Sequence, residues 1–148
     1  MKIAVASDHR GFVLKGKIID YLKDNYEILD LGTNSEDAAD YPIYGIKLGE
    51  TVANKEADLG IAICGSGIGI SIACNKVKGI RCAKVDSIDD AYLTRKDNDA
   101  NVIALNGSID FSKAIEIIDK FLNTPFEPND RYIRRINEIK EYEETTKI

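Results

Sequence analysis

The sequence predicts an α/β protein with a single-domain, three-layer αβα, Rossmann-like fold around a five-stranded parallel sheet. Short apolar runs alternate with longer segments of helical periodicity, and turn residues separate the two kinds of segment. Five such strand–helix repeats favour parallel strands joined by right-handed crossovers, with helices on both faces. The chain has 148 residues, enough for one core, so we expect one domain over residues 1–148.

Each repeat carries its own signals. After the first apolar run, Val13 and Ile18 belong to a segment of helical spacing. Pro42 falls in the first turn of the second helix, where its missing N–H needs no partner. Ser87 or Asp86 can cap the fourth helix. The expected strands are 3–6, 27–31, 59–63, 81–85 and 102–105, and the expected helices are 11–23, 41–54, 68–75, 88–96, 112–122 and, beyond two prolines, 130–144.

Composition disfavours several classes of function. The net charge of −5 argues against non-specific nucleic-acid binding, and no apolar run approaches the roughly 18 residues of a membrane span. The strand-like run at 1–6 is not a signal peptide. Three cysteines without metal or redox spacing, and a single histidine, argue against a zinc site. Free thiols imply a reducing compartment, so we expect a cytoplasmic protein without nucleic-acid or membrane partners.

The parallel sheet indicates where a ligand should bind. Ligands of such sheets bind beyond the carboxyl ends of the strands, where the strand order reverses. The candidate ligand loops therefore follow the first four strands, at residues 7–11, 32–42, 64–69 and 86–87. We expect the turn at 96–101, just before the fifth strand, to approach them as well.

The loop after the third strand is the most informative. Residues 61–71 (IAICGSGIGIS) read as a buried strand, a glycine-rich turn and a helix start. Backbone N–H groups at a helix start attract anions, and glycines let an oxyanion or a phosphate approach them closely. Cys64 would face the same point, where the helix dipole favours its thiolate. Ser66 and Ser71 add hydroxyl donors. The loop therefore predicts chemistry on a small anionic substrate.

Two other interpretations of this loop exist. A tight turn without any ligand would use the same glycines. A dinucleotide-binding loop is disfavoured, because Gly65, Gly67 and Gly69 follow the third strand and do not have the G-x-G-x-x-G spacing expected after the first.

Other polar clusters are candidate binding residues. Asp8 and His9 end the first strand, and we expect His9 to contact substrate with Asp8 fixing its tautomer, although a lone histidine is often structural. Asp40, by contrast, needs no ligand if it caps the second helix. The 97–101 segment (DNDAN) suits a turn, but acids near a helix C-terminus are disfavoured and suggest a use for the carboxylates.

The last helix carries two arginines four residues apart, which is about one helical turn. Arg131 and Arg135 would share one helix face and can bind a phosphate in a bidentate way that lysine cannot match. The alternative is an ordinary solvated face.

Five motifs together resemble the type B ribose-5-phosphate isomerases, which are related to the galactose-6-phosphate isomerase subunits. They run in the right order over nearly the whole chain, and the cysteine–glycine loop is the specific part. The motifs are SDHRG at 7–11, DYP at 40–42, CGSGIGIS at 64–71, NKVKGIR at 75–81 and NDAN at 98–101.

The resemblance implies an aldose–ketose isomerase without cofactor or metal, which interconverts ribose 5-phosphate and ribulose 5-phosphate through a cis-enediolate. Cys64 falls on the base that moves the proton between C1 and C2. Asp8 and His9 fall on residues that bind hydroxyls and phosphate. Arg131 and Arg135 fall on arginines of a C-terminal helix that reaches the partner subunit of a homodimer, with a tetramer as the alternative. The other implied substrate contacts are Tyr41, Gly65, Ser66, Gly67, Ile68, Gly69, Ser71 and Asn98.

Three positions depart from the family pattern. Asp97 replaces the usual histidine, which is proposed to open the sugar ring, Ser108 replaces an arginine, and Tyr132 replaces a histidine. We therefore expect Asp97, with Ser66, to assist ring opening if burial or Asp99 raises the pKa of Asp97. An isomerase of a six-carbon sugar phosphate and a non-catalytic sugar-phosphate binding protein stay open as alternatives.

Overall fold

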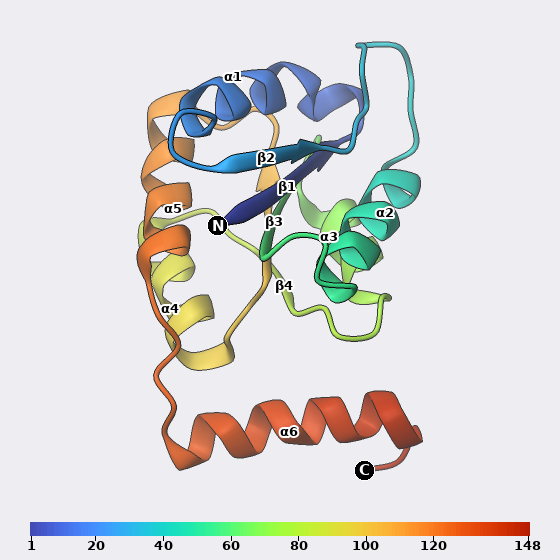
Figure 1. The fold of residues 1–148 in the computed structure, drawn as a ribbon. Coiled ribbons are helices and arrows are strands. Elements are labelled where there is room, and N and C mark those ends of the chain that lie inside the picture. Colours follow the sequence, from blue (N-terminus) through green and yellow to red (C-terminus); the bar gives the residue numbers. More distant parts are fainter.

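All 148 residues are described in the structure, which is a computed structural model. Strands and helices alternate as the sequence predicts, with a parallel sheet between two helical layers (Figure 1). The strands are β1 (Lys2–Ser7), β2 (Glu27–Asp30), β3 (Leu59–Cys64), β4 (Cys82–Lys84) and β5 (Val102–Asn106). The helices are the 3₁₀ turn η1 (His9–Gly11), α1 (Phe12–Leu22), α2 (Tyr41–Ala53), α3 (Ile68–Asn75), α4 (Ile88–Asn98), α5 (Phe111–Asn123) and α6 (Asp130–Thr145).

The strand order creates one crevice at the carboxyl edge of the sheet. The order is β2-β1-β3-β5-β4, and all neighbouring strands are parallel. From β1 the chain crosses to β2 on one side, whereas from β3 it crosses towards β4 on the other. The order thus reverses between β1 and β3, the position at which such sheets bind ligands. Ser7 pairs with Ile63 there, so the loops after both strands begin side by side.

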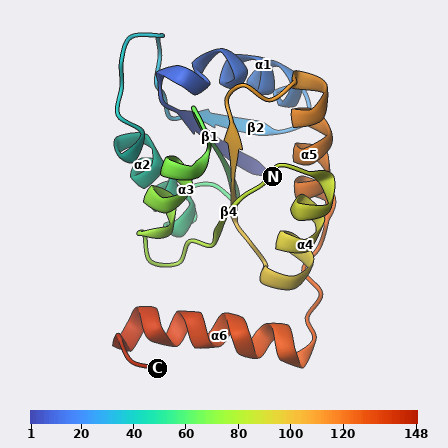
Figure 2. The same ribbon diagram turned by 180° about the vertical axis from the view of Figure 1, so that it is seen from behind.

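Helices cover both faces of the sheet. α1, α4 and α5 lie on one face and α2 and α3 on the other (Figures 1 and 2). Side chains alternate along each strand, so β1 contributes Ile3 and Val5 to the core beneath α1 and α5. Ala4 and Ala6 of the same strand face α2 and α3.

Three strands, β1, β3 and β5, end one residue further along the chain than predicted, and the extensions of β3 and β5 affect the site. β3 reaches Cys64 and β5 reaches Asn106, and these two residues pair in register. The predicted cap of α4 is confirmed, because Ser87 Oγ accepts the Asp90 N–H at 3.1 Å. No helix combines the length and the apolar composition that a membrane span requires.

The turn at 96–101 lies at the amino edge of the sheet. The carbonyl of Asn101 accepts the Gly60 N–H at the start of β3, at 2.9 Å. The expectation that this turn approaches the ligand loops of its own chain is therefore wrong. α4 runs antiparallel to the strands, so its last residues return to the opposite edge.

α6 also lies at this amino edge, set apart from the sheet (Figure 1). Ile136 is its only buried residue. Near its C-terminus, Glu143 accepts the Gly79 N–H at 2.9 Å, and near its N-terminus, Lys96 Nζ donates to Tyr132 Oη at 3.2 Å. The rest of the helix leaves most of its surface exposed.

Candidate active site

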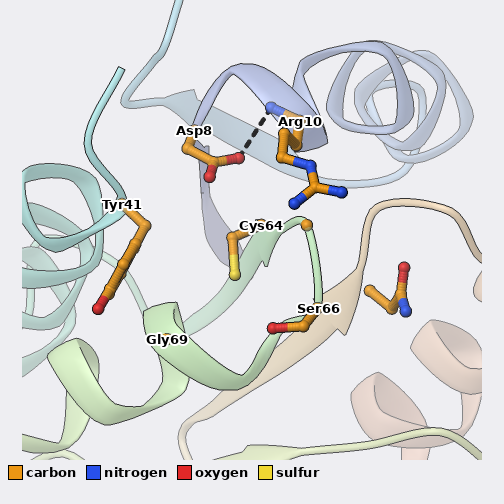
Figure 3. A pocket seen from close by; sticks show the side chains of 8 residues that line it. Asp8, Arg10, Tyr41, Cys64, Ser66 and Gly69 are labelled. Atoms are coloured by element: carbon orange, nitrogen blue, oxygen red, sulfur yellow. Dashed lines mark hydrogen bonds between the residues drawn. The ribbon is translucent and has the colours of Figure 1, made fainter. Parts of the chain in front are cut away.

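A pocket of about 310 Å³ opens in the crevice at the carboxyl ends of β1 and β3 (Figure 3). Its residues come from the three loops that follow β1, β2 and β3, and from the end of β5. They are Asp8, Arg10, Tyr41, Cys64, Gly65, Ser66, Gly69 and Asn106. Six of these eight were predicted as site residues, and Arg10 and Asn106 were not.

Cys64 lies at the base of the pocket, where β3 ends. The residue is 4% exposed, and its Sγ accepts the Gly67 N–H at 3.2 Å. A hydrogen bond from an N–H at the start of α3 stabilises negative charge on that sulfur. The side chain is thus a buried thiol that reaches the pocket and has a donor suited to its thiolate form.

The three glycines of the loop are required for two reasons: space for a neighbouring side chain at two of them, and backbone conformation at the third. A Cβ on Gly65 would lie 2.7 Å from Cζ of Arg10, and one on Gly69 would lie 2.8 Å from the ring of Tyr41. Both glycines therefore let a pocket side chain lie flat against the backbone. Gly67 has φ +79°, a left-handed conformation that L-residues disfavour.

The loop leaves several donors free at the start of α3. Gly67 N–H is used by Cys64, and Ile68 N–H by the Ser66 Oγ at 3.1 Å. The N–H groups of Gly65, Ser66 and Gly69 have no acceptor within the chain. Free N–H groups beside a thiol can stabilise the oxygen of a developing oxyanion.

The two serines of the loop behave differently. Ser66 Oγ only accepts a hydrogen bond, so its own hydrogen remains available to the pocket that it lines. Ser71 Oγ instead donates to the Ile68 carbonyl at 2.7 Å. The prediction that Ser71 adds a donor to the loop is therefore wrong, because its hydrogen is used within the helix.

Asp8 shapes the first loop. Its Oδ1 accepts the N–H groups of Arg10 at 2.9 Å and Gly11 at 3.2 Å, which caps η1 (Figure 3). The expected pairing of Asp8 with His9 is absent. Instead, His9 Nδ1 lies 3.1 Å from both the N–H and the carbonyl oxygen of Ala39, so the ring attaches the loop between β2 and α2 in either tautomer. His9 does not line the pocket.

Tyr41 begins α2 and lies across the pocket from Arg10 (Figure 3). Asp40 occupies the N-cap position before it, as predicted, but its side chain makes no capping bond. Pro42 removes one of the two possible donors, the N2 N–H, and the other donor, the N3 N–H of Ile43, makes no bond to Asp40. The Asp40 carboxylate is therefore not committed to the helix.

Four predicted site residues lie far from this pocket in their own chain. Asp97 and Asn98 end α4 at the amino edge of the sheet, and Arg131 and Arg135 are exposed on α6. Asn98 lines a separate cavity of about 520 Å³ between α6, β4 and α4. A single chain does not bring these four residues to Cys64.

Asp97 was expected to donate a proton only if its surroundings raise its pKa, and they do not. Lys96 Nζ donates to its carboxylate at 2.9 Å and holds the pKa of Asp97 below its usual value, and Tyr132 and Arg131 act in the same direction. The same contact raises the pKa of Lys96. Asp99, expected as the group that would raise the pKa of Asp97, is itself paired with Arg95 at 2.8 Å.

Arg10 and Asn106 are the pocket residues that sequence reasoning missed. Arg10 stands within the SDHRG motif, where only its two predecessors were considered. Asn106 lies beyond the predicted end of the fifth strand. Its pairing with Cys64 depends on the register of β3 and β5, which no local pattern reveals. Extending the carboxyl-edge rule to every strand would have found it.

The other two cysteines, Cys74 and Cys82, do not line the pocket. Cys74 is fully buried, and its Sγ donates to the Gly45 carbonyl at 3.3 Å. A hydrogen bond with Cys74 and burial raise the pKa of Cys82. No group of three or more His, Cys, Asp or Glu side chains is arranged to hold a metal ion.

The fold and the pocket define a class of protein: a small αβα enzyme with a thiol and free N–H groups at a strand–helix junction, suited to a small substrate that becomes anionic. Comparison with known proteins identifies the family. The family model described as ribose/galactose isomerase matches residues 3–139, so the chain belongs to that family and is an isomerase.

Individual relatives agree with this assignment. The ribose-5-phosphate isomerase B of Mycobacterium tuberculosis is 38% identical over 148 residues, covering 98% of this chain and 91% of that protein. The structure of ribose-5-phosphate isomerase B from Clostridium thermocellum matches with a TM-score of 0.95 at 42% identity, over 99% and 100% of the two chains. The Mycoplasma genitalium enzyme, solved with bound ribulose-5-phosphate, has a TM-score of 0.92 at 42% identity and 97% coverage of both.

Proposed function

We propose that the protein interconverts ribose 5-phosphate and ribulose 5-phosphate through a cis-enediolate, with Cys64 as the base. The carrying observation is the buried Sγ of Cys64, held by the Gly67 N–H beside the three free N–H groups of its loop. The pentose phosphate is supported by relatives named as ribose-5-phosphate isomerases, one of which holds ribulose-5-phosphate.

The chemistry requires one base and an oxyanion site. The Cys64 thiolate removes the proton from C2 of the open-chain aldose, and the electron pair moves onto the C1 carbonyl oxygen. Free N–H groups at Gly65, Ser66 and Gly69 stabilise that oxygen, a contribution worth about 3–4 kcal/mol per donor removed in comparable sites. A proton passes from O2 to O1, and the Cys64 thiol returns its proton to C1, which yields the ketose.

Ring opening needs a proton donor to the ring oxygen. The low pKa of Asp97 makes it a carboxylate near neutral pH, so it can accept a proton but cannot supply one. We assign the donor role to Ser66, whose hydroxyl hydrogen is free and whose side chain lines the pocket. Replacement of Ser66 by Ala should slow turnover of the cyclic sugar more than exchange on the open-chain ketose.

A homodimer would complete the pocket, and a tetramer would be built from the same pair. Ile68 and Ile72 lie one turn apart on α3 and are 55% and 56% exposed, next to the mouth of the pocket. On α6, Arg134 pairs with Glu138, whereas Arg131 and Arg135 pair with no acid. A second copy packed on this α3 stripe would bring its own arginines, and its own Asn98, towards the phosphate end. A sedimenting monomer with full activity would rule out this arrangement.

Cys64 works as a base only while it is reduced. All three cysteines are free thiols, which supports a cytoplasmic location, where thiols are kept reduced.

The six-carbon alternative rests on the departures at Asp97, Ser108 and Tyr132. Against it, the relatives are named as ribose-5-phosphate isomerases, and one of them was solved with bound ribulose-5-phosphate. Comparing kcat/KM across five- and six-carbon sugar phosphates separates the two. A preference for the pentose is expected, and a preference for a hexose phosphate would replace the proposal.

The catalytic role of Cys64 has a direct test. Cys64→Ala removes the base, and we expect isomerisation to fall by a factor of about 10²–10⁴. Cys74→Ala removes a buried thiol outside the pocket and serves as the matched control. Isomerisation at the wild-type rate in Cys64→Ala would disprove the mechanism.

A further inference from the structure

We infer that Arg10 binds the phosphate group of the substrate, as a cation contributed by the same chain that contributes Cys64. The inference rests on the proposed function. It assigns a ligand to a residue that the sequence analysis left without a role.

The first observation is how the guanidinium is held. A Cβ on Gly65 would lie within 2.7–2.8 Å of Cζ, Nη1 and Nε of Arg10, so the guanidinium plane lies against the Gly65 backbone. Figure 3 shows it directed over Cys64, on the side away from Tyr41. A planar fork that is already oriented loses little side-chain entropy when it binds a phosphate.

The second observation concerns the backbone of Arg10. Its N–H donates to Asp8 Oδ1 at 2.9 Å, and a Cβ on Gly107 would lie 2.5 Å from its carbonyl oxygen. The loop after β5 therefore packs directly on Arg10. Contacts from three segments (residues 8, 65 and 107) fix both ends of this residue at the pocket.

The third observation is that the charge of Arg10 is not used by the protein. Arg81, Arg95 and Arg134 each pair with a carboxylate, whereas the Arg10 guanidinium forms neither an ion pair nor a side-chain hydrogen bond. Asp8 is the acid in the same pocket, and its Oδ1 accepts hydrogen bonds from two backbone N–H groups. The guanidinium therefore presents five unpaired N–H donors in the pocket, which suits it to bind an anion from solution.

The composition of the pocket makes the anion a phosphate and not the enediolate. Oxyanion donors are already present at Gly65, Ser66 and Gly69, and Arg10 is the only cation among the lining residues. Ser108 leaves the loop after β5 without a cation, although this loop packs on Arg10 through Gly107. Within one chain, Arg10 is the group available to neutralise a phosphate dianion.

Binding of inorganic phosphate tests the assignment without relying on turnover. Titration calorimetry of wild type and Arg10→Gln should show a Kd for phosphate raised about 10- to 100-fold, as expected for loss of a charged hydrogen bond. KM for ribose 5-phosphate should rise by the same factor with kcat unchanged, because phosphate binding is equal in ground and transition states. Arg10→Lys should lie between the two, since an ammonium lacks the bidentate fork.

Two further variants sharpen the result. Lys17→Gln removes one exposed charge from the neighbouring helix α1 and should leave the Kd unchanged. The double variant Arg10→Gln with Ser108→Arg places an arginine next to Gly107 and should recover phosphate binding.

An unchanged phosphate Kd in Arg10→Gln would overturn the inference, and so would a loss of kcat at unchanged KM, which would put Arg10 at the reacting carbons. If wild type binds phosphate through Arg10 but isomerises no sugar phosphate, the proposed function fails and the assignment of Arg10 stands.

Discussion

Gly67→Ala should destabilise the protein at the point where the thiol and the oxyanion donors meet. Gly67 has φ +79°, and an L-residue in that conformation costs about 1–2 kcal/mol. A Cβ there would also lie 2.9 Å from the carbonyl carbon of Leu105 and 3.0 Å from its oxygen. These are backbone atoms of the interior strand β5, which cannot rotate away, and such overpacking adds about 1–3 kcal/mol. The expected loss in free energy of unfolding is about 2–5 kcal/mol.

Gly16→Ala is the matched control. Gly16 lies within α1, and a Cβ there meets no atom within 4 Å. The same chemical change should therefore raise the free energy of unfolding by about 0.4–1 kcal/mol, because the unfolded chain loses freedom. Urea denaturation followed by circular dichroism measures both. Equal stability of Gly67→Ala and wild type would refute the described loop geometry.

Two further outcomes are expected. The Lys15 side chain is 2% exposed, and its Nζ lies 2.6 Å from Asp30 Oδ1. Asp30→Ala leaves this buried charge without its carboxylate and should lower the free energy of unfolding in urea by about 2–3 kcal/mol, less than for a fully buried pair because Asp30 is 44% exposed. Lys15→Met leaves no buried charge and should cost less, and the reverse ranking would contradict a buried-charge effect. Lys96→Met should raise the pKa of Asp97 towards 3.8 in a carboxylate NMR titration. Because the folded-state pKa of Asp97 is lowered, its ion pair stabilises the protein above about pH 4, and that contribution is lost as the pH falls through the folded-state pKa. An unchanged titration of Asp97 in Lys96→Met would show that Lys96 does not cause the lowered pKa.

The sequence was sufficient for the elements and the main loop because both leave local signals. Alternating apolar runs located every strand, and the Cys64 loop combined a strand end, glycines and a helix start. Arg10 and Asn106 have no such signal, since their places in the pocket follow from packing on Gly65 and from the β3–β5 register. Asp40 occupies the expected N-cap position without a capping hydrogen bond, and Pro42 removes the N2 N–H, one of the two possible donors.

The same distinction explains the residues that one chain does not assemble. The composition of the segment with Asp97 and Asn98 was recognised, but its position depended on the direction in which α4 crosses the sheet. Arg131 and Arg135 lie on a helix whose only buried residue is Ile136. Where such a helix reaches is a property of an assembly, and the sequence pattern of one chain does not determine it.

Hydrogen exchange at the sugar carbons tests the central claim, that Cys64 carries the proton between C2 and C1. Ribose 5-phosphate incubated with the enzyme in D₂O should acquire deuterium at C2, and the ribulose 5-phosphate formed should acquire it at C1. Cys64→Ala should lose both by a factor of about 10²–10⁴ while keeping its affinity for phosphate. Exchange at the wild-type rate in Cys64→Ala would contradict the account.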